Sequence, residues 1–152
     1  MEQTTLLIEK LKNNSPGIAF VVGDEFGWNS KTKTVTYDES SPELEAYLLH
    51  ECGHALLGHD DYERDIDLIA MERDAWKTAQ EIAATHNLII QSDTVQDALD
   101  TYRDWMHARA LCPTCGAAGI ETSKHEYTCV SCRGKWQVNE ARRCALRRYT
   151  TK

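Results

Sequence analysis

No segment of the sequence approaches the roughly 18 consecutive apolar residues that a membrane-spanning helix needs. The N-terminal residues also lack the basic stretch and the apolar core that are typical of a secretory leader. The usual sequence signs of a membrane or secreted protein are therefore missing. We expect a cytoplasmic protein that has no membrane partner.

Internal repeats, low-complexity segments and the composition of a disordered chain are absent as well. Hydrophobic residues make up 41% of the 152 residues and charged residues make up 27%, as in ordinary globular proteins. This length suits one compact domain followed by a small module. We therefore look for two parts with separate roles.

Acidic and basic side chains are unevenly distributed along the chain, whose net charge is −7. Residues 1–108 contain 8 basic and 21 acidic side chains, whereas residues 109–152 contain 9 basic and 3 acidic ones. An acidic body with a basic tail indicates two modules that meet different partners. We predict a first domain over residues 1–110 and a second over residues 111–152.

Four of the six cysteines form two Cys-x-x-Cys pairs, separated by thirteen residues. In a chain expected in the cytoplasm, such pairs indicate a metal site rather than disulfide bonds. Two knuckles of this kind bring four thiolates into a tetrahedron and leave no open position for chemistry. We therefore predict a small zinc ribbon whose structural zinc is bound by Cys112, Cys115, Cys129 and Cys132.

The remaining sequence predicts an α+β domain. Residues 18–22 read as a buried strand, and residues 31–37 alternate as an edge strand protected by lysines. Ser41 and Pro42 are typical of a helix start, and Gly58 of a helix end. The expected helices cover residues 5–13, 41–58, 63–86 and 92–110.

The helix expected over residues 41–58 contains the motif H-E-x-x-H. His50 and His54 are one turn apart on one helix face, so both imidazoles can bind one zinc ion. Glu51 is rotated by about 100° from His50, so it lies beside the metal, where a general base for a zinc-bound water belongs. We predict a catalytic zinc here, which makes two zinc ions per chain.

A catalytic zinc usually has a third protein ligand. On a helix over residues 63–86, Glu72 falls inside the apolar stripe that runs from Leu68 to Ala83. A carboxylate on a core face needs a partner, and zinc would be one. We favour Glu72, while Asp65, His59 and Glu63 remain alternatives.

Residues 47–59 resemble the active-site helix of ImmA/IrrE-type metallopeptidases, which are compact gluzincins. The segment from Glu72 to Trp76, with Ala79 and Ala83, is similar to the glutamate-bearing helix of that family. The resemblance covers roughly residues 15–86. It implies a zincin-like domain with a short sheet, zinc bound by His50, His54 and Glu72, and Glu51 as base and acid. It also implies that the strand over residues 31–37 aligns the substrate.

The sequence departs from that family in two respects. We find no helix-turn-helix of the kind that family members use to bind DNA, and the ribbon lies outside the shared pattern. The identity of the substrate therefore cannot be inferred from the family.

Tyr62 and Tyr102 are candidates for the group that stabilises the oxyanion.

We expect a zinc-dependent endopeptidase that hydrolyses peptide bonds of an intracellular protein, with Glu51 activating a zinc-bound water. The alternative is a regulatory protein in which the ribbon binds nucleic acid or protein and the H-E-x-x-H site is inactive or not a peptidase. A metal-dependent hydrolase of another substrate is a third reading. The basic segment from Arg142 to Tyr149 could serve a nucleic-acid or protein partner.

Overall fold

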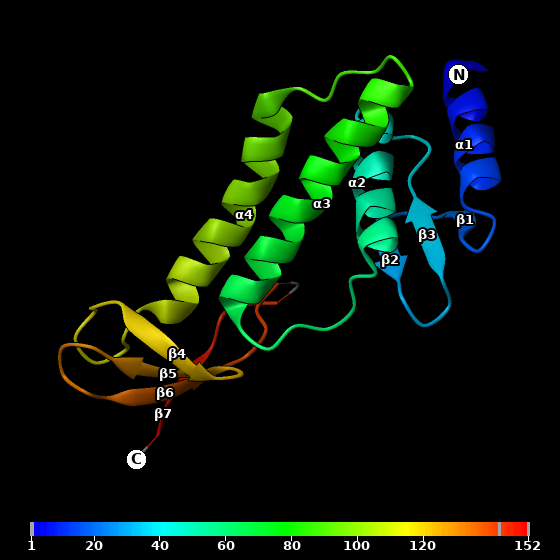
Figure 1. The fold of residues 1–152 in the computed structure, drawn as a ribbon. Coiled ribbons are helices and arrows are strands. Elements are labelled where there is room, and N and C mark those ends of the chain that lie inside the picture. Colours follow the sequence, from blue (N-terminus) through cyan, green and yellow to red (C-terminus); the bar gives the residue numbers. More distant parts are fainter. Residues whose placement is uncertain (1, 143, 152) are drawn as a thin grey trace. The chain divides into compact units, whose positions relative to one another are not determined.

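The computed structural model describes residues 2–142 and 144–151, and its elements are shown in Figure 1. The helices are α1 (Glu2–Asn14), α2 (Leu44–Leu57), α3 (Asp65–Thr85) and α4 (Ser92–Ala110). The strands are β1 (Ala19–Val22), β2 (Gly27–Asn29), β3 (Thr34–Tyr37), β4 (Gly119–Ser123), β5 (Glu126–Cys129), β6 (Lys135–Val138) and β7 (Arg148–Thr151). The predicted α+β class is confirmed. No helix within the described ranges is long and apolar enough to cross a membrane.

The chain folds into two compact units. Residues up to Asp61 and Met71–Val95 form the first unit, while Tyr62–Ala70 and the residues from Gln96 onward form the second. Helices α3 and α4 therefore each contribute residues to both units. The predicted domains, residues 1–110 and 111–152, stay a prediction.

The first unit contains a three-stranded sheet in the order β1-β3-β2. Strand β3 is parallel to β1 and antiparallel to β2, and Val35 in β3 is fully buried. The predicted edge strand over residues 31–37 is therefore wrong, because β3 is the central strand. Lys31 and Lys33 lie in the turn before it, where Lys33 has φ 54°. The alternating pattern does predict a strand here. It does not predict that β3 pairs with both β1 and β2, because these pairings depend on residues outside β3 itself.

Strand β1 was predicted to be buried, and this is also wrong. Val21 and Val22 are each 49% exposed, since β1 lies at the edge of the sheet. Its apolar run is short and could not be distinguished from a core strand by pattern alone.

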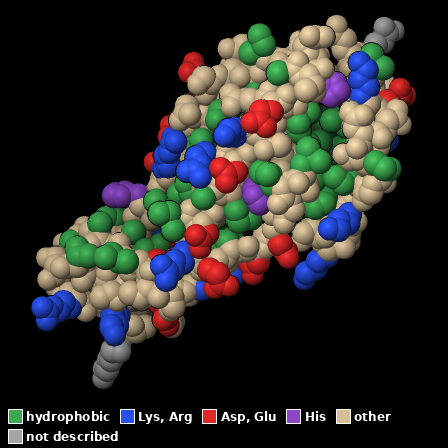
Figure 2. Space-filling view, viewed as in Figure 1, with side chains coloured by type: hydrophobic (Ala, Val, Ile, Leu, Met, Phe, Trp, Pro, Cys, Tyr) green, Lys and Arg blue, Asp and Glu red, His purple; other side chains and the backbone are tan. Residues whose placement is uncertain are grey.

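In Figure 2, hydrophobic side chains gather over α2, between α3 and this sheet.

Helix α2 lies between the sheet and α3 (Figure 1). It begins at Leu44, two residues after Pro42, which was the predicted first helical position. The Ser41 hydroxyl does accept a bond from the Glu43 amide at 3.2 Å. Its end is as predicted: Gly58 adopts the left-handed conformation (φ 67°) that favours glycine after a helix. The helix therefore covers the whole H-E-x-x-H motif.

Gly53, inside that motif, allows α2 and α3 to approach closely. A Cβ atom at this position would lie 2.3 Å from the Ala75 carbonyl oxygen. Glycine is thus required by the contact between the two helix backbones. The apolar stripe predicted for α3 is buried at Leu68, Ala75, Ala79 and Ala83. Glu72 is buried on the same stripe, as predicted.

The second unit contains an antiparallel sheet in the order β4-β5-β6-β7. Its core is formed by Tyr127, Trp136 and Val138, together with Cys112 and Cys129. The rings of Tyr127 and Trp136 stack, with centroids 5.6 Å apart. Strand β7 was not predicted, because its arginine-rich segment shows no alternation of apolar and polar residues.

A buried ion pair fixes the first turn of α3 within the second unit. The Arg109 guanidinium donates two bonds to the Asp65 carboxylate, at 2.7 and 3.1 Å, and both side chains are almost fully buried. Asp65 also accepts a bond from the Tyr127 hydroxyl. The Asp65 amide donates to Glu121 at 2.7 Å. This network links the start of α3 to α4, β4 and β5.

Candidate metal centres

Helices α2 and α3 bring three ligand atoms to one point inside the first unit. His50 Nε2 lies 2.8 Å from Glu72 Oε2, and His54 Nε2 lies 3.2 Å from the same oxygen. The two Nε2 atoms are 3.1 Å apart. His50 and His54 face α3 because they are one turn apart, and Glu72 meets them because it lies on the buried stripe of α3.

All three side chains are buried, with 5–7% of each residue exposed. Burial raises the pKa of Glu72, but the polar contacts with His50 and His54 outweigh it and hold that pKa well below its usual value. Burial also lowers the pKa of His50, although the bond to Glu72 opposes this. The balance favours an ionised Glu72 carboxylate and a neutral His50 imidazole, which are the protonation states that metal ligation needs.

Aromatic side chains form one wall of this triad. The His50 ring stacks on Trp76 with centroids 4.2 Å apart and an angle of 23°. Tyr47 packs edge-on against Trp76, and Phe26 packs against Tyr47, each at 5.4 Å. The His50 imidazole is therefore held in place by packing.

The arrangement fits a divalent metal ion. Donor atoms about 2.0–2.1 Å from a tetrahedral zinc lie about 3.3 Å from each other, close to the three separations observed here. Two imidazoles with one carboxylate are also a donor set that occurs in catalytic zinc sites. The structure thus contains a candidate His-His-Glu metal site.

The alternative third ligands lie elsewhere. Asp65 is paired with Arg109, and Glu63 is exposed. His59 is close to the triad, but its Nδ1 lies 2.9 Å from Nδ1 of His54, on the side of that ring away from Glu72. Burial and the neighbouring His54 lower the pKa of His59.

Glu51, the predicted base, follows His50 on α2 and is 9% exposed. Tyr62 and Tyr102, the candidates for oxyanion stabilisation, both belong to the second unit. There Tyr62 lies beneath the Lys124 ammonium, and Tyr102 accepts a bond from Arg142 at 3.2 Å. Their predicted role in oxyanion stabilisation stays a prediction.

The four ribbon cysteines also meet at one point. Cys112 Sγ lies 3.7 Å from Cys132 Sγ, and Cys115 Sγ lies 3.5 Å from Cys129 Sγ. All four sulfur atoms lie within 4.8 Å of one another. Because every position is a cysteine, the cluster fits a closed, structural metal site.

Backbone amides prepare two of these thiols for ligation. Bonds from Cys115 and Thr114 lower the pKa of Cys112 to about 6, and the amides of Cys132 and Ser131 lower the pKa of Cys129. Backbone N–H groups that donate hydrogen bonds to a cysteine sulfur favour its thiolate form, which is the form that binds metal. The remaining cysteines differ: burial raises the pKa of Cys52 to about 12, and Cys144 is exposed. Cys52 is a core residue, as predicted.

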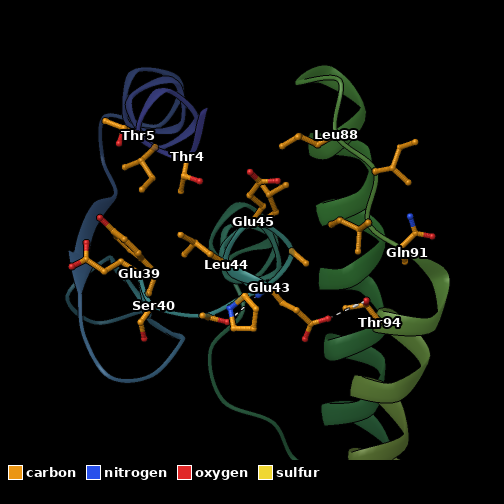
Figure 3. A pocket seen from close by; sticks show the side chains of 18 of the residues that line it. Thr4, Thr5, Glu39, Ser40, Glu43, Leu44, Glu45, Leu88, Gln91 and Thr94 are labelled. Carbon is orange, nitrogen blue, oxygen red and sulfur yellow. Dashed lines mark hydrogen bonds between the residues drawn. The ribbon is translucent and has the colours of Figure 1, made fainter. Parts of the chain in front are cut away.

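A hollow of about 940 Å³ lies at the start of α2 in the first unit. Figure 3 shows that α1, the first residues of α2 and the segment from Leu88 to Thr94 line it, and that Thr94 bonds to Glu43 (3.3 Å). Its charged side chains are mostly acidic: Glu9, Lys12, Glu39, Glu43 and Glu45. None of the triad residues lines it, so this hollow is separate from the metal site.

Sequence reasoning missed two features near these sites. It treated His59 only as a possible ligand and did not anticipate its contact with the far side of the His54 ring. It also read Arg109 as part of a basic tail, whereas Arg109 is fully buried. Neither contact has a local sequence signal, because each depends on residues that the fold brings together.

Comparisons of this chain with protein-family models, with curated proteins and with solved structures find no match. The resemblance to ImmA/IrrE-type metallopeptidases therefore rests on the sequence pattern of residues 15–86 alone. What the structure shows is a buried His50, His54 and Glu72 triad and a separate four-cysteine cluster.

Proposed function

We propose that the protein is a zinc-dependent endopeptidase whose active site is formed by α2 and α3. The observation that carries this proposal is the convergence of His50, His54 and Glu72, with Glu51 next to the first ligand on α2. The H-E-x-x-H spacing combined with a glutamate from the following helix is typical of metal-assisted peptide hydrolysis.

A zinc ion bound by these three side chains would supply a Lewis acid that polarises a carbonyl and makes water more acidic. Glu51 would take the proton of the attacking water and pass it to the leaving amine. The stacked Trp76 would keep His50 in its binding orientation. The low exposure of all four polar side chains would keep bulk water away from the charges.

Strand β2 is the sheet edge that we propose for the substrate, in place of the strand over residues 31–37. It is an outer strand of the sheet, and its Trp28 indole donates a 2.9 Å bond to the His59 carbonyl, just beyond the second histidine ligand. An extended peptide could add to such an edge by main-chain hydrogen bonds. The substrate would then be an unfolded or extended protein segment.

The test is the variant Glu51→Gln in zinc-loaded protein, incubated with a library of peptides from digested, denatured proteins. Mass spectrometry of new peptide ends measures cleavage, and elemental analysis measures zinc. We expect Glu51→Gln to cleave peptides at least about 100-fold more slowly than the wild type, because the base is lost. The variant should still bind two zinc ions per chain.

Glu45→Gln, in the first turn of the same helix, is the matched control and should cleave like the wild type. The proposal would be contradicted by a Glu51→Gln protein of wild-type activity, or by a wild-type protein that binds two zinc ions and cleaves no peptide of the library.

For the second unit we propose a structural zinc bound by the four cysteines. Two arginines of the basic segment are engaged inside this unit: Arg148 donates to the Leu111 carbonyl at 2.6 Å, and Arg142 pairs with Glu140 at 3.6 Å. These contacts favour a role in folding. A protein or nucleic-acid partner for the ribbon remains a proposal.

A further inference from the structure

We propose that His59 is a positioning residue for the metal site: it accepts a hydrogen bond from Nδ1 of His54 and thereby directs the lone pair of His54 Nε2 at the metal. This inference rests on the proposed zinc site. It assigns to His59 a role beside the triad, in place of the alternative role as a ligand.

The geometry of the two rings supports this role. Nδ1 of His54 and Nδ1 of His59 are 2.9 Å apart, and the ring centroids are 5.1 Å apart at an angle of 64°. A neutral imidazole has one N–H, so a proton on Nδ1 of His54 leaves a lone pair on Nε2. That Nε2 is the atom that faces His50 and Glu72.

In this tautomer, the Nε2 lone pair of His54 faces the Glu72 carboxylate at 3.2 Å. Two electron-rich atoms at this distance repel each other unless a cation lies between them. The bond to His59 therefore selects the tautomer that suits metal binding and disfavours the alternative, in which His54 would donate to Glu72. An acceptor on the outer nitrogen also makes the imidazole a stronger ligand.

The His59 ring is held in position by its own backbone. Gly58 adopts the left-handed conformation, and this turn directs the His59 amide back to the His54 carbonyl at 3.0 Å. The His59 carbonyl accepts the 2.9 Å bond from the Trp28 indole. The next residue, Asp60, accepts a 2.7 Å bond from the Ser30 hydroxyl. The loop after α2 is thus fastened to β2 and to the turn that follows it.

His50 provides an internal contrast. Among the described residues, no hydrogen-bond partner reaches its Nδ1. Its ring is oriented by stacking on Trp76 instead. The two histidine ligands are therefore held by different means, and only His54 depends on a hydrogen bond to a neighbouring ring. Loss of His59 should disturb His54 and leave His50 unchanged.

The experiment compares His59→Leu with His59→Asn. The Asn Oδ1 atom occupies nearly the place of Nδ1 and can accept the same bond, whereas leucine cannot. Competition with a chromophoric chelator gives the Zn²⁺ affinity of the second, weaker site, and nitrogen NMR of metal-free protein gives the tautomer of His54. The four-cysteine site in the same molecule serves as the reference.

We expect His59→Leu to weaken Zn²⁺ binding by about 10–100-fold and to shift His54 away from the Nδ1–H tautomer. His59→Asn should restore most of the affinity and the tautomer. His86→Leu, at a histidine of the same unit that lies after α3, should bind Zn²⁺ like the wild type. If His59→Leu does not fold, Trp28→Phe, which removes the indole N–H that bonds to the His59 carbonyl and keeps an aromatic ring, should still weaken Zn²⁺ binding measurably.

Two results would overturn the inference while the proposed zinc site stands. One is wild-type affinity and an unchanged His54 tautomer in His59→Leu. The other is equal loss in His59→Asn and His59→Leu, which would indicate a steric role. A wild-type protein that binds Zn²⁺ only at the cysteines would instead contradict the proposed function itself, and this result is visible before any variant is made.

Discussion

At the scale of single residues, the candidate site depends on Gly53 as much as on its ligands. The triad can form only if α2 and α3 are close enough for Glu72 to reach both histidines. The Ala75 carbonyl fills the space that a side chain at position 53 would need. The second variable position of the H-E-x-x-H motif is therefore determined by packing.

Replacement of Gly53 by alanine should force the two helices apart. The added Cβ would lie 2.3 Å from the Ala75 oxygen, so we expect a loss of about 1–3 kcal/mol in the free energy of unfolding. Zn²⁺ affinity at the triad should fall as well. Urea denaturation and chelator competition measure the two effects.

Gly17→Ala is the matched control, because nothing lies within 4 Å of the Cβ that it would add. It should leave both quantities unchanged. A Gly53→Ala protein with wild-type stability and Zn²⁺ affinity would show that the helix contact is not needed for the site.

At the scale of elements, helix α3 carries two buried carboxylates with different partners. Asp65 in its first turn is paired with Arg109, and Glu72, two turns later, faces the histidines. The position of Asp65 is thus set by contacts within the second unit. Glu72 follows on the same continuous helix.

Arg109→Met should strongly destabilise the second unit. The variant keeps the volume of the side chain but leaves the Asp65 carboxylate buried without its cation, which we expect to cost about 3–5 kcal/mol in the free energy of unfolding. Urea denaturation of the zinc-loaded protein measures the loss. The bonds from Arg109 to the backbone carbonyls of Asn139 and Glu140 are removed as well.

Arg103→Met provides the comparison on the same helix. Arg103 is exposed and pairs with Asp100 at 2.8 Å, so its loss should change stability by no more than about 0.5 kcal/mol. Equal stabilities of the Arg103 and Arg109 variants would mean that the buried network does not hold the second unit together.

Local patterns predicted the helices well and the sheets poorly. The end of α2 at Gly58 and the whole of α4 follow from caps and periodicity, which act over a few residues. The central position of β3 depends on pairing with β1 and β2, which its own alternating pattern does not specify. Strand β7 was missed because its partner β6 determines its conformation.

The candidate site could be predicted because its ligands lie on helices, whose local patterns are readable in the sequence. His50 and His54 are related by one helical turn, and Glu72 was found by its place on an apolar stripe, so each choice used local periodicity. The contact of His59 with His54 needed the left-handed turn at Gly58 and the bond from Trp28. The first is an irregular backbone conformation, and the second joins residues that are 31 positions apart. No periodic sequence pattern predicts either feature.

At the scale of the whole molecule, the chain combines two candidate metal sites of different chemistry. The four-cysteine cluster is closed and is expected to supply folding energy to a small module. The His-His-Glu triad leaves one position of a tetrahedral ion open, as hydrolysis requires. The two sites share no ligand, so removal of one should leave the other able to bind metal.

The metal content of the protein tests this account most directly. Elemental analysis of purified wild type should give two zinc ions per chain, and Glu72→Ala should give about one, because two imidazoles alone bind too weakly. Glu81→Ala, an exposed glutamate on the same helix, should keep two. Two zinc ions in the Glu72→Ala protein, or only one in the wild type, would contradict a zinc site formed by His50, His54 and Glu72.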